Sequence, residues 1–188
     1  MDRRIKKTQI LLKETLTNLI EKKELRNITV SELCELANIN RGTFYLHYVD
    51  IYDMIEKFEK AIVNDLIKII EKNSPISADY YILPVLIQVI EYLYKDMRFV
   101  KAMLSKNGDS HFLEQLRRTM LVQTKQSLPA FAPKFDETFI RFLSVFIVSG
   151  GAGVFQEWLN DDCQVPLKSV IFPCEIMISS GISKISSY

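Results

Sequence analysis

Apolar residues recur three or four positions apart in one stretch of this chain after another, and no stretch alternates apolar with polar residues as a half-buried strand does. In residues 5–20 the apolar positions follow this spacing, while most lysines and glutamates take the opposite side of the same helix. With 188 residues, 48% of them hydrophobic, the chain fits one compact domain or two small ones that share a core. We therefore expect an all-α fold.

Residues 29–48 have the pattern of two short helices joined by a tight turn. Thr29, followed by Glu32, forms a capping box that starts the first helix, and the residues at 38–40, Asn-Ile-Asn, interrupt it. A second short helix is expected over 41–48, with Phe44 and Tyr48, four residues apart, facing the core. Its opposite side carries Gly42, Thr43, Tyr45 and Leu46. This pattern fits a helix-turn-helix in a three-helix domain, although spacing alone does not establish one.

Beyond residue 49 the same spacing predicts a bundle of further helices. The expected helices cover residues 50–71, 83–96, 99–104, 110–127, 136–158 and 166–185. The first of these is long enough to link two halves of the molecule. We expect a helix-turn-helix domain at 1–49 and a second helical domain at 50–188.

Positive charge is concentrated at the amino terminus. The formal net charge of +1 argues neither for nor against a polyanionic partner, but the first 48 residues hold nine Lys and Arg against six Asp and Glu. Four of these basic residues, Arg3, Arg4, Lys6 and Lys7, lie together. As a mobile arm before a helix they would suit phosphate contact; the alternative is a terminus that only aids solubility.

Neither export nor a membrane span is predicted. The three cysteines are an odd number without CxxC spacing, so they suit a reducing cytoplasm better than a disulfide framework or a zinc knuckle. Polar residues interrupt the apolar run at 10–20, which argues against a signal peptide. The longest uncharged stretch, 142–156, falls short of the roughly 20 apolar residues of a spanning helix. We expect a cytoplasmic protein with no membrane partner.

Residues typical of catalysis are missing from the sequence. His47 and His111 lie outside any metal-binding spacing, and the adjacent Asp161 and Asp162 fit a solvated loop better than an acid–base pair. The Gly-Gly-Ala-Gly run at 150–153 lacks the following Lys of a phosphate loop. We predict no catalytic residue, no cofactor and no metal, and hence not an enzyme.

The segment TVSELCELANINRGTFYLHYVDIYDM, Thr29 to Met54, resembles the DNA-binding signature of the tetracycline repressor (TetR) family of transcriptional regulators. The resemblance implies that the Gly-Thr-Phe-Tyr run at 42–45 belongs to the helix that reads DNA. Leu46 stands where many members have Arg, and Ile51 stands where Lys is common, so two expected DNA contacts are missing. Leu46 instead turns an apolar side chain toward the duplex, where a thymine methyl group suits it.

The residues expected at double-stranded DNA are Arg3, Arg4, Lys6, Lys7, Thr29, Arg41, Gly42, Thr43, Tyr45, Leu46 and His47. Thr29 lies at a helix start, where its hydroxyl and the free backbone N–H groups suit a phosphate oxygen. Tyr45 and His47 are assigned to the DNA backbone by resemblance; the alternatives are a partly buried ring and an ordinary surface histidine. Thr43 and Leu46 are the choices for base edges.

Residues 97–118 and 146–161 resemble, more loosely, the carboxy-terminal domain of regulators of dihydroxyacetone kinase operons. In the TetR family the last two helices normally form the dimer interface, which the resemblance assigns to 136–159 and 166–185. The expected interface residues are Phe139, Phe146, Gly150, Gly151, Gly153, Val154, Trp158, Ile171 and Ile178. The glycines would let helix backbones approach closely, with a functional kink as the alternative.

Together these features predict a sequence-specific regulator of transcription, a repressor, that binds a palindromic operator as a homodimer. The aromatic-rich middle of the chain, including Tyr80 and Tyr81, suits either a hydrophobic core or an apolar ligand pocket. Two signals stay open at the carboxy-terminal domain, a small-molecule effector or a partner protein. The helix at 50–71 is the expected lever between sensing and DNA binding.

Overall fold

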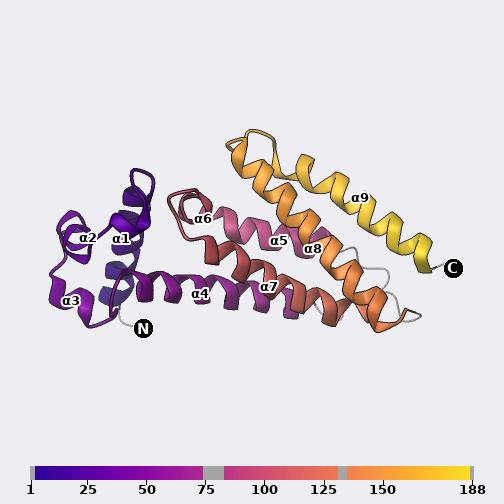
Figure 1. Cartoon of the computed structure of the whole chain (residues 1–188), viewed down its shortest axis with the longest axis horizontal. Coiled ribbons are helices and arrows are strands. Elements are labelled where there is room, and N and C mark those ends of the chain that lie inside the picture. The colour runs from indigo at the N-terminus through magenta and orange to yellow at the C-terminus, as the bar shows by residue number, and fades with distance from the viewer. Residues whose placement is uncertain (1–2, 74–82, 131–134, 187–188) are drawn as a thin grey trace. The chain divides into compact units, whose positions relative to one another are not determined.

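The computed structural model describes residues 3–73, 83–130 and 135–186. Within these ranges the chain forms nine α-helices, two short 3-10 helices and no strand, which confirms the expected all-α fold (Figure 1). In chain order they are α1 (Arg3–Ile20), η1 (Leu25–Asn27), α2 (Val30–Leu36), α3 (Arg41–Tyr45), α4 (Ile51–Lys72), α5 (Leu83–Tyr94), α6 (Met97–Leu104), α7 (Ser110–Ser127), η2 (Leu128–Ala130), α8 (Glu137–Asn160) and α9 (Leu167–Ser186). Every helix expected from the apolar spacing is present.

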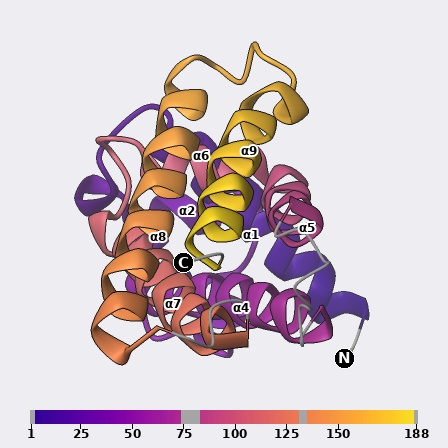
Figure 2. The same ribbon diagram turned by 90° about the vertical axis from the view of Figure 1, so that its right-hand side faces the viewer.

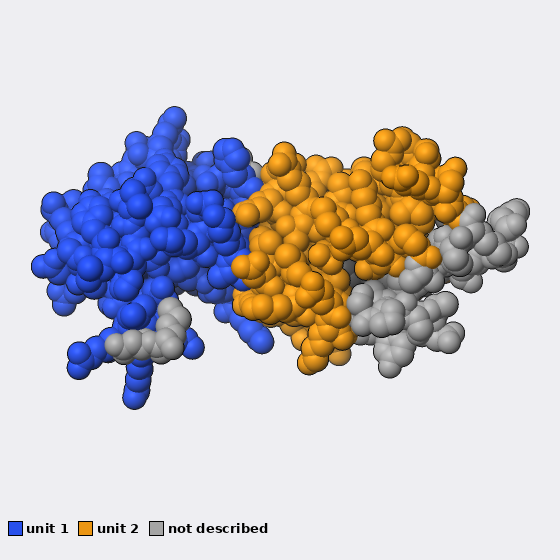
Figure 3. Space-filling model, turned by 90° about the horizontal axis from the view of Figure 1, so that it is seen from below, with its two compact units in different colours: residues 1–62, 95–113 blue, residues 63–94, 114–188 orange. Residues whose placement is uncertain are grey.

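The chain divides into two compact units (Figure 3). Unit 1 comprises residues 1–62 and 95–113, and unit 2 comprises residues 63–94 and 114–188. The helix-turn-helix therefore shares its unit with the first half of α4, with α6 and with the start of α7. The domain boundary expected after residue 49 stays a prediction.

In unit 1, α1 packs against α2 and α6. The buried apolar residues of α1 follow the three- and four-residue spacing, and they are Leu12, Leu16, Leu19 and Ile20. Phe44 of α3 and Met54 of α4, both fully buried, belong to the core of the same unit. Burying one such side chain contributes about 1.5–3 kcal/mol, so this core fixes which side of α3 faces outward.

Side-chain caps shape the turn between α2 and α3. The N–H of Glu32 donates to the hydroxyl of Thr29 at 3.2 Å, as the capping box predicts. Asn40 starts α3 by accepting the N–H of Gly42 at 2.7 Å. Asn38 has a φ of 51°, in the left-handed region that Asn tolerates better than most residues. The turn expected at 38–40 is therefore confirmed.

Helix α3 is shorter than expected, since it ends at Tyr45 rather than at Tyr48. The N–H groups of His47 and Tyr48 both donate to the carbonyl of Phe44, each at 3.0 Å, which tightens and closes the last turn. Residues 46–50 therefore form a connection to α4. Hydrogen bonds to Asp53 and Lys57 of α4 hold this connection in place.

Polar bonds join α6 to α1 within unit 1. Arg98 donates to Glu21 Oε2 at 2.7 Å and to Asn18 Oδ1 at 2.9 Å. Lys13 pairs with Asp96, and its ammonium lies 4.6 Å from the centre of the Phe99 ring. Partly exposed pairs of this kind are individually weak, but several together set the register of two packed helices.

Unit 2 holds the rest of α4 and α7 together with α5, α8 and α9, and Figure 2 shows α8 and α9 side by side. The hydroxyl of Tyr92 in α5 donates to Asp65 of α4 at 2.9 Å. Burial and this hydrogen bond raise the pKa of Tyr92 to about 12, so the hydroxyl stays a donor. The indole N–H of Trp158 donates to the carbonyl of Val165 at 2.8 Å, which fixes the turn from α8 to α9.

Helix α8 is long and apolar enough to cross a membrane by length and composition, and 17% of its most apolar window is buried. The uncharged stretch at 142–156 is thus part of a longer helix of 24 residues. One such helix is weak evidence for a membrane protein, because a helix that pairs with another protein surface has the same composition.

Candidate nucleic-acid interface

The outward face of α3 consists of side chains that the core does not use. Phe44 is fully buried and Tyr48 is 3% exposed, whereas Tyr45 and Leu46 are 57% and 79% exposed. The rings of Phe44 and Tyr45 meet edge to face with their centres 5.5 Å apart, so the buried ring supports the exposed one. Thr43 is half-buried. The exposure of Tyr45 and Leu46 agrees with the outward side predicted by helical spacing.

Residues at the starts of α2 and α3 offer further polar groups. Thr29 is exposed, and its hydroxyl can still donate while it caps α2. Arg41 is exposed and donates to the hydroxyl of Ser31. A Cβ at Gly42 would lie 3.1 Å from Oδ1 of Asn40, which is tighter than ordinary contact. Glycine at 42 therefore leaves room for the cap that starts α3.

The basic residues expected to form a mobile arm lie inside a helix instead. Helix α1 begins at Arg3, so Arg3, Arg4, Lys6 and Lys7 occupy its first two turns, all four exposed. Lys and Arg have high helix propensity, so these basic residues favour a helix that starts as early as Arg3. Their charge is thus fixed to α1 rather than carried on a separate arm.

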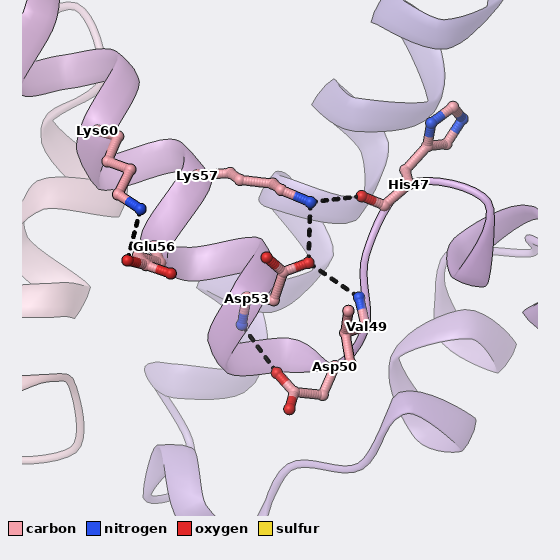
Figure 4. A network of polar contacts seen from close by, with 7 residues as sticks. All are labelled: His47, Val49, Asp50, Asp53, Glu56, Lys57 and Lys60. Carbon is pink, nitrogen blue, oxygen red and sulfur yellow. Dashed lines mark hydrogen bonds and ion pairs between the residues drawn. The ribbon is translucent and has the colours of Figure 1, made fainter.

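The connection between α3 and α4 is fastened by side chains of α4, as Figure 4 shows. The ammonium of Lys57 donates to the carbonyl of His47 at 2.8 Å and to Asp53 Oδ2 at 2.9 Å. The same carboxylate oxygen accepts the N–H of Val49 at 2.9 Å. Asp50 caps α4 by accepting the N–H of Asp53 at 2.8 Å. His47, assigned to the DNA backbone by resemblance, is therefore held to α4 through its own carbonyl.

Sequence reasoning missed Asp53 and Lys57, although their four-residue separation on one helix face was a usable signal. The hydrogen bonds from Lys57 and from the Val49 N–H lower the pKa of Asp53, so it is ionised at neutral pH. Lys57 also lies 5.3 Å from the centre of the Tyr48 ring. These two residues link the end of the helix-turn-helix to α4.

A second candidate surface lies on α8 and α9 in unit 2. Its exposed apolar residues are Phe142, Val145, Phe146 and Val154 on α8, and Phe172, Ile176 and Met177 on α9. Phe146 is 68% exposed and Met177 is 71% exposed, values that are high for large apolar side chains. Gly150, Gly151 and Gly153 are open, since a Cβ at each would meet nothing within 4 Å. Because these glycines have no side chain, the backbone of α8 is open to close approach at these positions.

The residues expected at the dimer interface do not all lie on this exposed surface. Trp158 and Ile171 are each 4% exposed, so they pack inside their own chain and cannot also form the surface. Phe139 is half-buried and stacks on Phe135 with ring centres 4.2 Å apart. Ile178 is half-buried as well. An apolar side chain at helical spacing predicts burial, but not whether its own chain or a partner buries it.

A hollow of about 470 Å³ in unit 2 is lined by Ile87, Lys168, Ser169, Ile171 and Phe172, from α5 and α9. Most of its wall is apolar, with one ammonium group. The mid-chain aromatics Phe99 and Phe112 are fully or almost fully buried and serve the core. Tyr80 and Tyr81, named among the possible pocket residues, lie outside the described residues. Within the described ranges no group of three His, Cys, Asp or Glu side chains suits a metal ion.

A helix-turn-helix with an exposed outer face, together with a helical unit that has its own core, is the arrangement typical of helical transcriptional regulators. The sequence model of a TetR-type transcriptional regulator C-terminal region matches residues 80–180, more than half of the chain. The chain belongs to this family of regulators. No curated protein matches the sequence.

Solved structures of three regulators share the fold. The fatty acid degradation regulator FadR from Bacillus halodurans has a TM-score of 0.64 at 13% identity, over 93% of this chain and 95% of that one. A TetR/AcrR-family regulator from Aquifex aeolicus VF5 has a TM-score of 0.62 at 18% identity, over 95% and 99% of the two chains. The dihydroxyacetone kinase operon activator DhaS has a TM-score of 0.57 at 16% identity, over 95% and 93%. The family and these structures are regulators, not enzymes.

Proposed function

We propose that this regulator binds a specific palindromic DNA operator as a homodimer, represses transcription from it, and acts in the cytoplasm. The observation that carries the proposal is the outward side of α3 and of the residues directly after it, where Tyr45 and Leu46 are exposed while Phe44 and Tyr48 are buried. A short helix presented in this way fits the major groove of B-DNA, which is about 12 Å wide. Thr43 and Leu46 are the residues proposed at base edges.

Contacts to the phosphates come from groups around this face. Arg41 and Thr29 supply a guanidinium and a hydroxyl at the starts of two helices, and the exposed basic turns of α1 add positive charge. Tyr45 and His47 are the further proposed contacts to the DNA backbone. Such contacts fix the register of the protein on the duplex, whereas base-edge contacts select the sequence.

The homodimer is proposed to form through the exposed apolar surface of α8 and α9. Two copies that bury Phe146 and its neighbours against each other remove this surface from water, which is the main driving force for such association. In a twofold dimer the two reading helices then face half-sites about one duplex turn, roughly 34–36 Å, apart. A palindromic operator follows from this symmetry.

A small-molecule effector in unit 2 is the proposed signal, since the hollow between α5 and α9 is largely apolar and carries one lysine. A partner protein that binds the same unit is the second candidate. The part of the exposed apolar surface of α8 and α9 that the dimer leaves uncovered would suit such a partner. Either signal must bind the DNA-competent and incompetent states unequally. Helix α4, which belongs to both units, is the proposed lever.

The test is selection of duplexes from a random pool, followed by binding titrations on the enriched sequence. We expect an inverted repeat, and we expect scrambling one half-site to weaken binding strongly. Tyr45→Ala and Arg41→Ala should weaken binding on most sequences. Arg118→Ala, which removes an exposed arginine of α7 in unit 2, is the matched control and should bind like the wild type. Enrichment of no motif, or equal binding to the scrambled duplex, would contradict the proposal.

A further inference from the structure

We propose that Lys57 of α4 is a positioning residue for DNA reading, because it fastens the reading segment, defined here as residues 41–49, to α4. The inference rests on the proposed function, in which α3 and the residues after it meet DNA. Lys57 acts through the backbone of His47 and through the carboxylate of Asp53, and not by touching the duplex itself.

The end of the reading segment depends on α4 for its backbone hydrogen bonds. Beyond Tyr45 the chain leaves the helix, and the carbonyl of His47 and the N–H of Val49 point to side chains of α4. Lys57 satisfies the carbonyl and Asp53 satisfies the N–H. Leaving such groups without partners disfavours the conformation that needs them, so the two side chains select this course of the chain.

Three contacts converge on one ammonium group. Lys57 bonds to the His47 carbonyl and to Asp53, and it lies over the ring of Tyr48. The rings of Phe44, His47 and Phe58 also neighbour Tyr48. Because the Tyr48 side chain is buried, the cation lies between a fixed ring and a fixed carboxylate. The position of the His47 carbonyl, and with it the direction of the His47 side chain, follows from this arrangement.

The next lysine along the same helix offers a matched comparison. Lys60 pairs with Glu56 at 2.6 Å, one turn from the Lys57–Asp53 pair (Figure 4). Both lysines are about half exposed and both form four-residue ion pairs. None of the bonds described for Lys60 reaches the reading segment, whereas Lys57 bonds to its backbone. Removing each charge in turn therefore separates the effect of positioning from that of net charge.

The experiment measures binding of Lys57→Met and Lys60→Met to the duplex that the wild-type protein enriches from a random pool. Loss of the charge-assisted bond to the His47 carbonyl should weaken binding by Lys57→Met about fivefold or more, while Lys60→Met stays within about twofold of wild type. Asp53→Ala should weaken binding in the same direction. The variant that carries both Lys57→Met and Asp53→Ala should lose less affinity than the product of the two single losses, because both residues hold the same segment.

Salt dependence distinguishes positioning from direct phosphate contact. A lysine that neutralises one phosphate adds about 0.9 to the slope of log affinity against log salt, so a positioning residue should leave the slope unchanged when it is replaced. If Lys57 instead met a phosphate, Lys57→Met would flatten the slope. Asp53→Ala would then free the ammonium and strengthen binding. Either result, or equal binding by Lys57→Met and Lys60→Met, would overturn the inference.

Amide hydrogen exchange in the absence of DNA keeps the test independent of the operator. Lys57→Met should speed exchange of the Val49 N–H, whereas Lys60→Met should leave it unchanged; equal rates in the two variants would also overturn the inference. If the wild type enriches no duplex, the proposed function fails and the role in DNA reading fails with it, while this measurement still decides whether Lys57 fastens the segment to α4. Lys57→Arg, which can keep both bonds, serves as a folded rescue variant if Lys57→Met is unstable.

Discussion

The side-chain amide of Asn107 donates to the carbonyl oxygen of Ile20 at 3.0 Å, across 87 positions of the chain. The carbonyl of Asn107 in turn accepts the N–H of Leu25 at 2.8 Å. Next to it, a Cβ at Gly108 would lie 2.2 Å from the carbonyl oxygen of Met103, so only glycine fits there without movement. The loop between α6 and α7 is thereby part of the unit that carries the helix-turn-helix.

Replacing Asn107 should destabilise unit 1. Asn107→Ala leaves the last-turn carbonyl of Ile20 without its donor, at a cost of about 1–3 kcal/mol in the free energy of unfolding. Urea unfolding followed by circular dichroism measures this loss. Lys106→Ala, at the exposed neighbouring position, is the control and should change stability little. Equal stabilities for the two variants would show that the Asn107 bond contributes nothing.

Glu59 makes the stability of unit 1 depend on pH. It is 5% exposed, and its Oε1 has no hydrogen-bond partner among the described residues. Burial, together with the carboxylates of Asp109 and Glu56, raises its pKa from 4.5 to about 7 against the opposing effect of His111. Between these two pH values the folded state keeps a proton that the unfolded chain releases. Stability should therefore fall as pH rises from 4.5 through 7 and then level off.

Glu59→Gln keeps the shape of the side chain and removes its titration. It should raise the free energy of unfolding by about 1–3 kcal/mol near pH 8, and change it little near pH 4. Urea midpoints measured across this range test the effect. Glu71→Gln, on the exposed side of the same helix, should not show it. If the wild type and Glu59→Gln lose stability in parallel as pH rises, Glu59 does not cause the dependence.

A charge at Phe146 should prevent dimerisation. Phe146 is 68% exposed in the apolar surface of α8 and α9, so Phe146→Glu would place a carboxylate where two copies are proposed to meet. Light scattering should change from about twice the 21.8 kDa chain mass to that mass itself. Val122→Glu, at a position 52% exposed on α7, is the matched control and should remain dimeric. A dimeric Phe146→Glu protein would place the interface elsewhere.

The fold was largely predictable from the sequence because its signals are local. Apolar spacing located the helices, and the capping box at Thr29 marked where one of them begins, with the N–H of Glu32 donating to the Thr29 hydroxyl. Helical geometry also separated the buried Phe44 from the exposed Leu46. Each of these inferences needed only residues within one or two turns of each other.

What the sequence did not reveal depends on contacts between elements. The bond from Lys57 to His47 joins residues ten positions apart, one before and one after the start of α4. The end of α3 at Tyr45, before His47, was not predicted either. The burial of Trp158 within its own chain depends on Val165 and on the Tyr94 ring, which no periodicity indicates. Spacing shows which side of a helix is apolar, but not which partner covers it.

The most direct test of the central claim, that α3 reads DNA, is a parallel selection of duplexes with the wild type and with Leu46→Ala. Leu46 is 79% exposed on the reading segment, and truncating it removes apolar contact without disturbing the core. We predict one inverted repeat for both proteins, with altered preference at one or two base pairs placed symmetrically in the half-sites. Identical preferences at every position would contradict the claim.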